Sequence, residues 1–303
     1  MENRCAVCPR RCGAPREHGP GTASAEQGRP LGVCGMGENP VVARAGVHLW
    51  EEPPISGTRG SGTVFFSGCP LGCVFCQNNA ISHGRFGKEI TVRRLREIYL
   101  ELAAQGVHNI NLVNPTHFTK AIAQSLEEPL PIPVVYNSGG YDRVESLRLL
   151  KGKVQVYLPD MKYVLPEASA RYSKAADYFK AASAAILEMY RQTGDYALDE
   201  NGLLTRGVLI RHLILPGNIR NTLAVIDWVR NTFPRGSVLF SLMSQYTPCG
   251  DLSAYPEINR RITKREYEKV QDYLFESGIE DGFLQQRTSA GREFIPPFDL
   301  SGV

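Results

Sequence analysis

Short apolar runs alternate with amphipathic stretches over most of the chain after residue 62. The runs are rich in β-branched and aromatic residues, which is typical of buried parallel strands. They predict strands at residues 63–66, 110–113, 133–136, 154–158, 208–215 and 237–240. Helical faces are predicted at Leu95, Ile98 and Leu102, at Val144, Leu147 and Leu150 after an Asp142 cap, and at Leu223, Ile226, Val229 and Phe233 after Asn218. The stretch 168–192 predicts one or two more helices.

Six strand–helix units in series predict an α/β fold with a parallel sheet and right-handed crossovers. The pattern fits either an open doubly wound sheet or a partial barrel. In both architectures, functional side chains gather at the carboxyl ends of the strands. The residues that follow each predicted strand are therefore the ones to inspect for chemistry.

Residues 1–56 differ from the rest of the chain. They are rich in Gly, Pro, Arg and Cys and contain few apolar runs. Such a segment cannot easily build a core of its own, so a bound metal would be a sensible source of stability. We therefore predict a Cys-rich metal-binding segment at 1–56 and an α/β unit at 57–303.

Composition narrows the class of protein. Of 303 residues, 43% are hydrophobic and 21% charged, which excludes global disorder. A formal charge of +3, from 34 basic and 31 acidic residues, gives no reason to expect nucleic acid or an anionic membrane as partner. The sequence contains no apolar run of about 20 residues and no secretory signal, so a cytoplasmic protein with reduced thiols is expected.

Cysteines are the strongest chemical signal. Cys69, Cys73 and Cys76 follow the first predicted strand, with Gly68 and Gly72 among them. Three thiolates on one short loop can hold an iron–sulfur cluster and leave one iron open for chemistry. A zinc loop completed by a remote ligand, or simply buried thiols, are the alternatives.

The motif Cys69-x3-Cys73-x-Phe75-Cys76 resembles the signature of the radical S-adenosylmethionine (SAM) superfamily. The resemblance implies a 4Fe–4S cluster whose open iron binds SAM, and cleavage of SAM to a 5′-deoxyadenosyl radical that abstracts a hydrogen atom. It also implies a partial (βα)6 barrel of the TIM type, with Phe75 near the adenine. Cys69, Cys73 and Cys76 would be the catalytic, cluster-binding residues.

The same resemblance implies SAM contacts at the strand ends. After the second strand, residues 114–117 depart from the Gly-Gly-Glu element that the family often has there, and Asn114 and Thr116 are the candidates in its place. The other candidates are Asn137, Ser138 and Gly139 after the third strand, Asp160 and Lys162 after the fourth, and His212 in the fifth. Each has a plainer interpretation. Residues 137–140 could be an ordinary turn, Asp160 and Lys162 a surface ion pair, and His212 a core histidine.

Residues 57–303 resemble in particular the pyruvate formate-lyase activating enzymes, and proteins like them with an extra N-terminal cysteine segment. This implies activation of a glycyl radical enzyme as protein partner, with a flavodoxin or ferredoxin as reductant. Hydrogen abstraction from another protein or a small molecule is the first alternative. A non-catalytic iron–sulfur electron carrier is the second. No membrane or nucleic acid partner is expected.

A second set of cysteines lies near the N-terminus. Cys5, Cys8, Cys12 and Cys34 supply four thiolates, which suit a closed structural zinc site or an auxiliary 4Fe–4S cluster. Unliganded cysteine is the third possibility. Arg10 and Arg11, within this set, are interpreted as a solvated basic loop, with guidance of an acidic partner as the alternative. Cys249 is interpreted as a buried thiol, with a radical-quenching or substrate-facing role as the alternative.

Overall fold

All six strands predicted from the apolar runs are present in the computed structural model, which describes residues 4–16, 32–285 and 296–303. They are β2 (Ser61–Phe66), β4 (Ile110–Val113), β5 (Val134–Ser138), β6 (Val156–Pro159), β8 (Leu204–Leu213) and β9 (Leu239–Met243). Each pairs in parallel with the next in this order. The expectation of a parallel α/β fold is confirmed.

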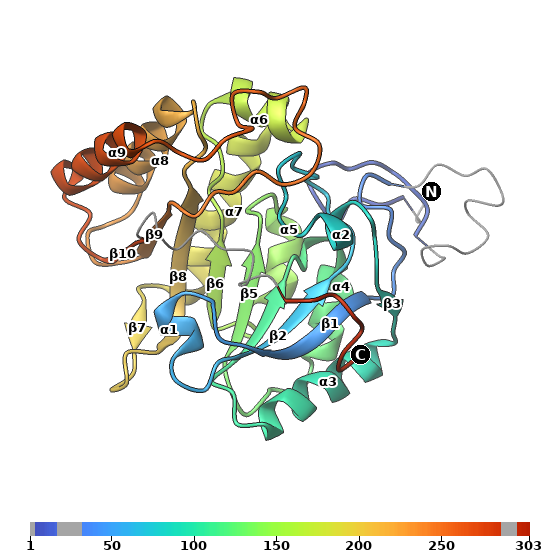
Figure 1. Cartoon of the computed structure of the whole chain (residues 1–303). Helices are drawn as coiled ribbons and strands as arrows, with labels where there is room; N and C mark the ends of the chain where they lie inside the picture. Colours follow the sequence, from blue (N-terminus) through green and yellow to red (C-terminus); the bar gives the residue numbers. More distant parts are fainter. Residues whose placement is uncertain (1–3, 17–31, 286–295) are drawn as a thin grey trace.

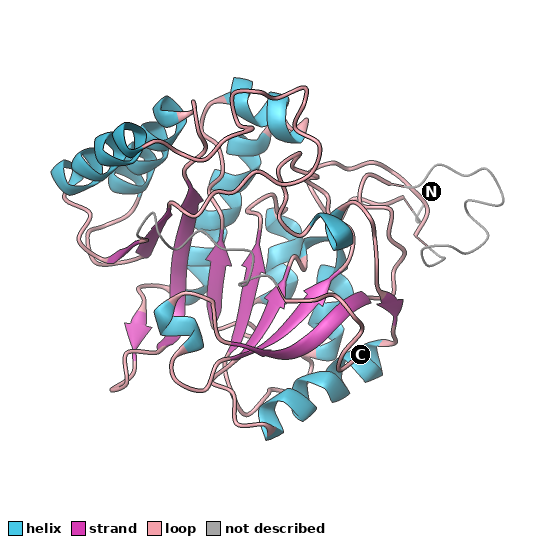
Figure 2. Cartoon of the chain, in the orientation of Figure 1, coloured by secondary structure: helices cyan, strands magenta, loops and turns pink. Residues whose placement is uncertain are grey.

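The sheet extends beyond these six strands at both edges. β1 (Val41–His48) runs antiparallel beside β2, and the short β3 (Lys88–Glu89) pairs with β1. At the other edge β10 (Gly282–Leu284) lies parallel to β9, and β7 (Ala197–Leu198) pairs with β8. The sheet order runs from β10 to β3, and within the described residues these two edges do not pair. The sheet is curved and open (Figure 2), as in a partial barrel.

Helices other than α1 pack along the convex side of the sheet or at its ends (Figure 1), and the buried faces of α3 and α8 largely match the predicted ones. α3 (Val92–Ala104) buries Leu95, Ile98 and Leu102, and α8 (Ile219–Thr232) buries Val225, Ile226 and Val229. The stretch 168–192 forms α6 (Pro166–Ser173) and α7 (Tyr178–Thr193). The other helices are α1 (Pro53–Ser56), α2 (Asn79–Ser82), η1 (Thr116–Phe118), α4 (Thr119–Ser125), α5 (Val144–Leu147), η2 (Arg148–Leu150) and α9 (Lys264–Ser277).

Asp142 does not cap its helix, so that prediction is wrong. α5 begins after Arg143, and the buried Asp142 carboxylate accepts hydrogen bonds from Tyr136 Oη (2.9 Å) and Ser138 Oγ (2.7 Å). The Asp142 carboxylate therefore binds two hydroxyl groups of β5 and not the amides of α5. Asp142 thereby fixes the carboxyl end of β5.

Side-chain alternation along the strands divides the interior into two parts. One large apolar cluster lies between sheet and helices and includes Ile110, Leu112, Tyr136 and Tyr157. A smaller cluster fills the concave side, where Ile55 of α1 packs with Val135, Val156, Leu158, Leu209 and Leu239. Because α1 closes the amino-terminal end of this concave space, the polar residues at the carboxyl ends of the strands lie above an apolar floor.

The last described residues return to β1. Ala45 N–H donates to Ser301 O (2.8 Å), Leu300 N–H donates to Ala43 O (3.0 Å), and Arg44 pairs with Asp299 (2.9 Å). Figure 1 shows this tail crossing beside β1. In the part of the chain that the structure describes, no helix has the length and apolarity to cross a bilayer.

Candidate active site

The loop after β2 carries Cys69, Cys73 and Cys76 and depends on a glycine at its start. Gly68 has a φ of +77°, and a Cβ there would lie 2.6 Å from the carbonyl oxygen of Cys34. Glycine is therefore required because the N-terminal segment approaches this backbone closely. The loop is also tied to other elements, since Gly68 N–H donates to Ile81 O (2.8 Å) and Val74 N–H to Tyr172 O (2.9 Å).

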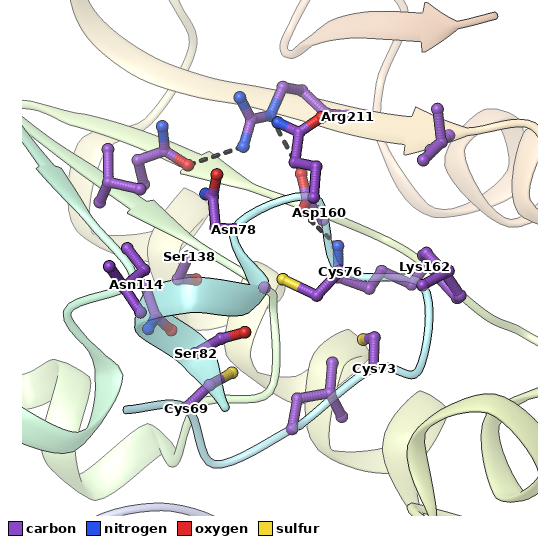
Figure 3. Close-up of a pocket in the computed structure, with 18 of the residues that line it drawn as sticks. Cys69, Cys73, Cys76, Asn78, Ser82, Asn114, Ser138, Asp160, Lys162 and Arg211 are labelled. Carbon is purple, nitrogen blue, oxygen red and sulfur yellow. Dashed lines mark hydrogen bonds and ion pairs between the residues drawn. The ribbon is translucent and has the colours of Figure 1, made fainter. Parts of the chain in front are cut away.

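All three thiols of this loop line one cavity of about 270 Å³. Figure 3 shows their sulfur atoms arranged around a common space. Burial raises the pKa of Cys69 to about 12 and also raises that of Cys76. Ser173 Oγ donates to Cys73 Sγ (3.1 Å). Loading a metal here would therefore displace thiol protons.

The donor set of the loop fits an iron–sulfur cluster. Cys69, Cys73 and Cys76 are free thiols on one cavity wall, and three thiolates leave one iron without a protein ligand. Within residues 4–16, 32–285 and 296–303, no three His, Cys, Asp or Glu side chains are grouped so as to hold a metal ion. A single ion needs its ligands in mutual contact, whereas a cluster separates its thiolates by irons and sulfides.

The strand-end residues predicted from the sequence meet at the same cavity. Phe75, Asn114, Thr116, Asn137, Ser138, Gly139, Asp160 and Lys162 all line it. Phe75 packs edge-to-face against Tyr246, with ring centroids 5.9 Å apart. Asn114 has a φ of +60°, and its Nδ2 donates to Gly68 O, so its amide supports the cysteine loop. Ser138 Oγ donates to Asp142 (2.7 Å).

An ionic network crosses the cavity floor. Asp160 accepts from Lys162 Nζ (2.6 Å) and Arg211 Nε (3.0 Å), and Arg211 also donates to Glu51 Oε2 (3.1 Å) and Asn137 Oδ1 (2.6 Å). The Asp160 and Lys162 side chains are only 13% and 21% exposed, so this is not a surface pair. Burial opposes the charge of Asp160, but Arg211 and Lys162 outweigh it and lower its pKa. Asp160 and Lys162 therefore both stay ionised.

Sequence reasoning missed several cavity residues. Arg211 lies in the fifth predicted strand and points to the concave side, where its side chain pairs with Asp160 and lines the cavity. Strand alternation could have identified it. Trp50 and Glu51 come from the loop after β1. Cys249, from the loop after β9, is half-buried and lines the same cavity, so its substrate-facing alternative fits this placement better than the buried-thiol interpretation. Glu52, next to Glu51, is buried, which raises its pKa, and it accepts from Ser241 Oγ (2.8 Å). No local signal places these residues here.

His212 does not line the cavity. Because it follows Arg211 on β8, it points to the opposite face of the sheet, where Nδ1 lies 2.6 Å from Met161 O and Nε2 lies 3.0 Å from Thr222 Oγ1. Burial lowers its pKa to about 4, so it is neutral. The core-histidine interpretation fits this placement. His117 is also buried, with a pKa lowered to about 3, and its Nε2 lies 2.7 Å from Ser67 O.

The four N-terminal cysteines lie in one region. Cys5, Cys8 and Cys34 are buried and Cys12 is exposed. Burial raises the pKa of Cys8 to about 12, and Cys34, Cys5 and Cys12 raise it further by their charges. Arg16 Nη1 lies 3.7 Å from Cys5 Sγ. The segment lies beside α2 and the cysteine loop (Figure 1).

Comparison with known proteins identifies one clear relative. The sequence is 33% identical over 278 residues to the uncharacterized protein MJ0674 of Methanocaldococcus jannaschii. The alignment covers 88% of this chain and 72% of the relative. No protein-family model matches the sequence.

Solved structures are similar to the chain at low sequence identity. HydG, a maturase of the FeFe-hydrogenase, matches with a TM-score of 0.50 and 16% identity over 76% of this chain and 53% of HydG. Methylornithine synthase matches with a TM-score of 0.49 and 16% identity over 72% of this chain and 62% of that protein. The chain thus spans less than two thirds of either structure. The HydG match indicates a common fold.

Proposed function

The chain belongs to the family of the uncharacterized M. jannaschii protein MJ0674, and for this member we propose the activity of a radical SAM enzyme. Cys69, Cys73 and Cys76 would hold a 4Fe–4S cluster, and SAM would occupy the cavity above the ionic network. When bound, this pair of groups supplies one-electron reductive cleavage of SAM to methionine and a 5′-deoxyadenosyl radical, which abstracts a hydrogen atom. The observation that carries the proposal is the meeting of three thiols and the strand-end polar groups at one cavity.

The chain's own residues would bind and orient SAM. Phe75 offers an apolar ring beside the cysteine loop, and Gly139 leaves the wall free of a side chain next to Lys162. Lys162 and Asp160 are ionised and paired with each other, and Arg211 also holds Asp160, so they can contact polar groups without moving. Asn137, Ser138, Asn114 and Thr116 would contribute through side-chain or backbone groups on the same wall.

The finer proposal is activation of a glycyl radical enzyme, with a glycine Cα–H as the target and a flavodoxin or ferredoxin as reductant. It is supported by the resemblance at residues 137–140 and 160–162. Another protein or a small molecule as hydrogen donor is the second candidate, favoured by the openness of the sheet. A second metal site at Cys5, Cys8, Cys12 and Cys34 belongs to the same proposal. Because no three possible ligands among the described residues are grouped around a single ion, an auxiliary cluster is favoured over zinc there.

The test is SAM cleavage by protein reconstituted with iron and sulfide without oxygen and then reduced. Methionine and 5′-deoxyadenosine should form, and Cys69→Ala, Cys73→Ala or Cys76→Ala should abolish both products. Cys249→Ala, which removes a thiol of the same cavity outside the loop, should retain cluster iron. Cluster-loaded protein that yields neither product would instead be an electron carrier.

The substrate is then sought by isotope transfer. Deuterated candidates, including a glycyl radical enzyme labelled at glycine, are incubated with the active protein and SAM. Deuterium in 5′-deoxyadenosine identifies the donor. Transfer from a small molecule and none from the labelled protein would reject the activase proposal while retaining the SAM chemistry.

A further inference from the structure

Arg10 links the N-terminal cysteine segment to the catalytic loop. Its guanidinium donates to Pro70 O (2.9 Å) and Leu71 O (3.2 Å), which lie between Cys69 and Cys73. It also donates to Ser173 O (2.7 Å) and to Lys174 O, at the end of α6. One side chain therefore holds four carbonyl groups from two separate elements, and the solvated-loop interpretation of Arg10 is wrong.

Both elements held by Arg10 contact Cys73. Pro70 and Leu71 precede it in the loop, and Ser173 donates its hydroxyl to Cys73 Sγ (3.1 Å). The guanidinium also lies 5.4 Å from the ring centroid of Tyr141, which lines the cavity. Because hydrogen bonds from a charged donor are stronger than those between neutral groups, Arg10 is a substantial restraint on one cluster ligand.

The position of Arg10 depends in turn on the N-terminal thiols. It lies between Cys8 and Cys12, and the backbone of this turn is closed by Arg11 N–H, which donates to Cys8 O (3.1 Å). The carbonyl of Cys34 packs against Gly68 at the start of the catalytic loop. The segment is anchored to α5 as well, since Ser146 Oγ donates to Val7 O (2.6 Å). A ligand that fixed these four thiols would fix the backbone from which Arg10 extends.

We propose that Arg10 is a positioning residue through which metal bound at Cys5, Cys8, Cys12 and Cys34 holds the catalytic cluster loop in place. The inference rests on the proposed cluster at Cys69, Cys73 and Cys76. With the N-terminal metal bound, Arg10 holds Pro70 and Leu71 at a fixed distance from Ser173. Loss of that metal frees the segment and loosens Cys73. The N-terminal site would then control the geometry of the catalytic cluster.

The first test compares Arg10→Ala with Arg11→Ala, its exposed neighbour, in the holoprotein. Arg10→Ala should keep the full metal content and accelerate amide exchange at Leu71 to Cys73 by roughly tenfold or more, because several charge-assisted bonds are lost. The electron paramagnetic resonance signal of the reduced cluster should also shift. Arg11→Ala should match wild type in both measurements, and Arg10→Lys should restore exchange in part. Wild-type exchange and signal in Arg10→Ala would overturn the positioning role.

The second test uses Cys12→Ser, which alters the exposed member of the N-terminal set. It should lose about one zinc or about four irons by metal analysis and reproduce the loop exchange of Arg10→Ala. The double variant should exchange no faster than either single one. Unchanged metal content, or metal loss with wild-type loop exchange, would overturn the coupling. Because exchange and metal content are read without turnover, absence of SAM cleavage in wild type would count against the proposed function alone.

Discussion

Gly140 is a residue at which the backbone of the site permits no side chain. It has a φ of +77°, and a Cβ there would overlap the carbonyl oxygen of Asp160 and lie 2.9 Å from Tyr178 Oη. Gly152 has the same φ, and a Cβ there would have no atom within 4 Å. An alanine at Gly152 would therefore incur only the free-energy cost of the left-handed backbone, whereas an alanine at Gly140 would incur that cost and the cost of overlap.

Gly140→Ala should lower the free energy of unfolding more than Gly152→Ala does. The left-handed backbone costs alanine about 1 kcal/mol at either position. At Gly140 the overlap adds about 1–3 kcal/mol, because the strand ends of β5 and β6 must move apart. Urea unfolding of the two variants measures the difference. Equal losses would mean that the β5 turn relaxes without strain.

His212 should make stability depend on pH. Its pKa is about 4 in the folded chain against an ordinary 6.5, so the unfolded chain takes up a proton that the folded chain refuses. Its contribution is complete above about pH 6.5 and is lost as pH falls toward 4, at up to about 1.4 kcal/mol per pH unit. His212→Gln should flatten this slope in urea unfolding between pH 7 and pH 5. A slope identical to wild type would show that other groups govern acid sensitivity.

Helix α7 supports the cavity from behind through one hydroxyl. Tyr178 Oη donates to Asp160 O (2.7 Å) and Gly139 O (2.9 Å) and accepts from Lys162 N–H (2.9 Å). The ring itself is fully buried. The helix therefore joins the end of β5 to the end of β6 at the point where three predicted SAM contacts lie.

Tyr178→Phe tests this support. Removing the hydroxyl leaves buried backbone groups without a partner, which should cost about 1–3 kcal/mol of unfolding free energy. SAM binding to the cluster-loaded protein should weaken as well. Tyr190→Phe, on the same helix, removes a hydroxyl that donates to Asp195 at the surface and should change both by little. Calorimetry measures the unfolding of both variants, and titration measures their SAM binding. Similar effects of Tyr178→Phe and Tyr190→Phe would contradict a specific support by Tyr178.

Elements with a strong local pattern could be predicted from the sequence, and those stabilised by distant contacts could not. The six parallel strands and α3 follow from runs such as 110–113 and the Leu95 face. β1 escaped prediction because residues 41–48 include Arg44 and Gly46, and the strand depends on pairing with β2. α9 has a capping box of Thr263 and Glu266 that a search for caps could have found.

The same limit applies to the site. Cys69, Cys73 and Cys76 share one loop, so their spacing alone predicts a common function. Asp160 and Lys162 could be placed because they follow a predicted strand. Glu51 could not, because it reaches Arg211 and Asn137 across the concave side from a loop far away in sequence. Arg10 escaped for the same reason.

Over the whole molecule, binding of SAM should stabilise the fold only when the cluster is present. SAM at about 100 times its Kd adds about 2.7 kcal/mol to the cluster-loaded protein by linkage. For a chain of this size, Tm should rise by roughly 5 °C. Metal-free protein and Cys76→Ala should show no rise in differential scanning calorimetry. A similar rise in metal-free protein would place SAM binding outside the cluster.

The tail beside β1 has a consequence for how the chain reaches its final form. β1 would present unpaired amides along its outer edge were Leu300 and Ser301 not bonded to Ala43 and Ala45. Unpaired edges invite pairing with a second chain. Because the two partners lie near opposite ends of the sequence, their contact closes a very long loop and should form late. Until that contact forms, the edge of β1 is exposed and can pair with another chain. Truncation of the tail, or a bulky tag on it, should therefore favour aggregation.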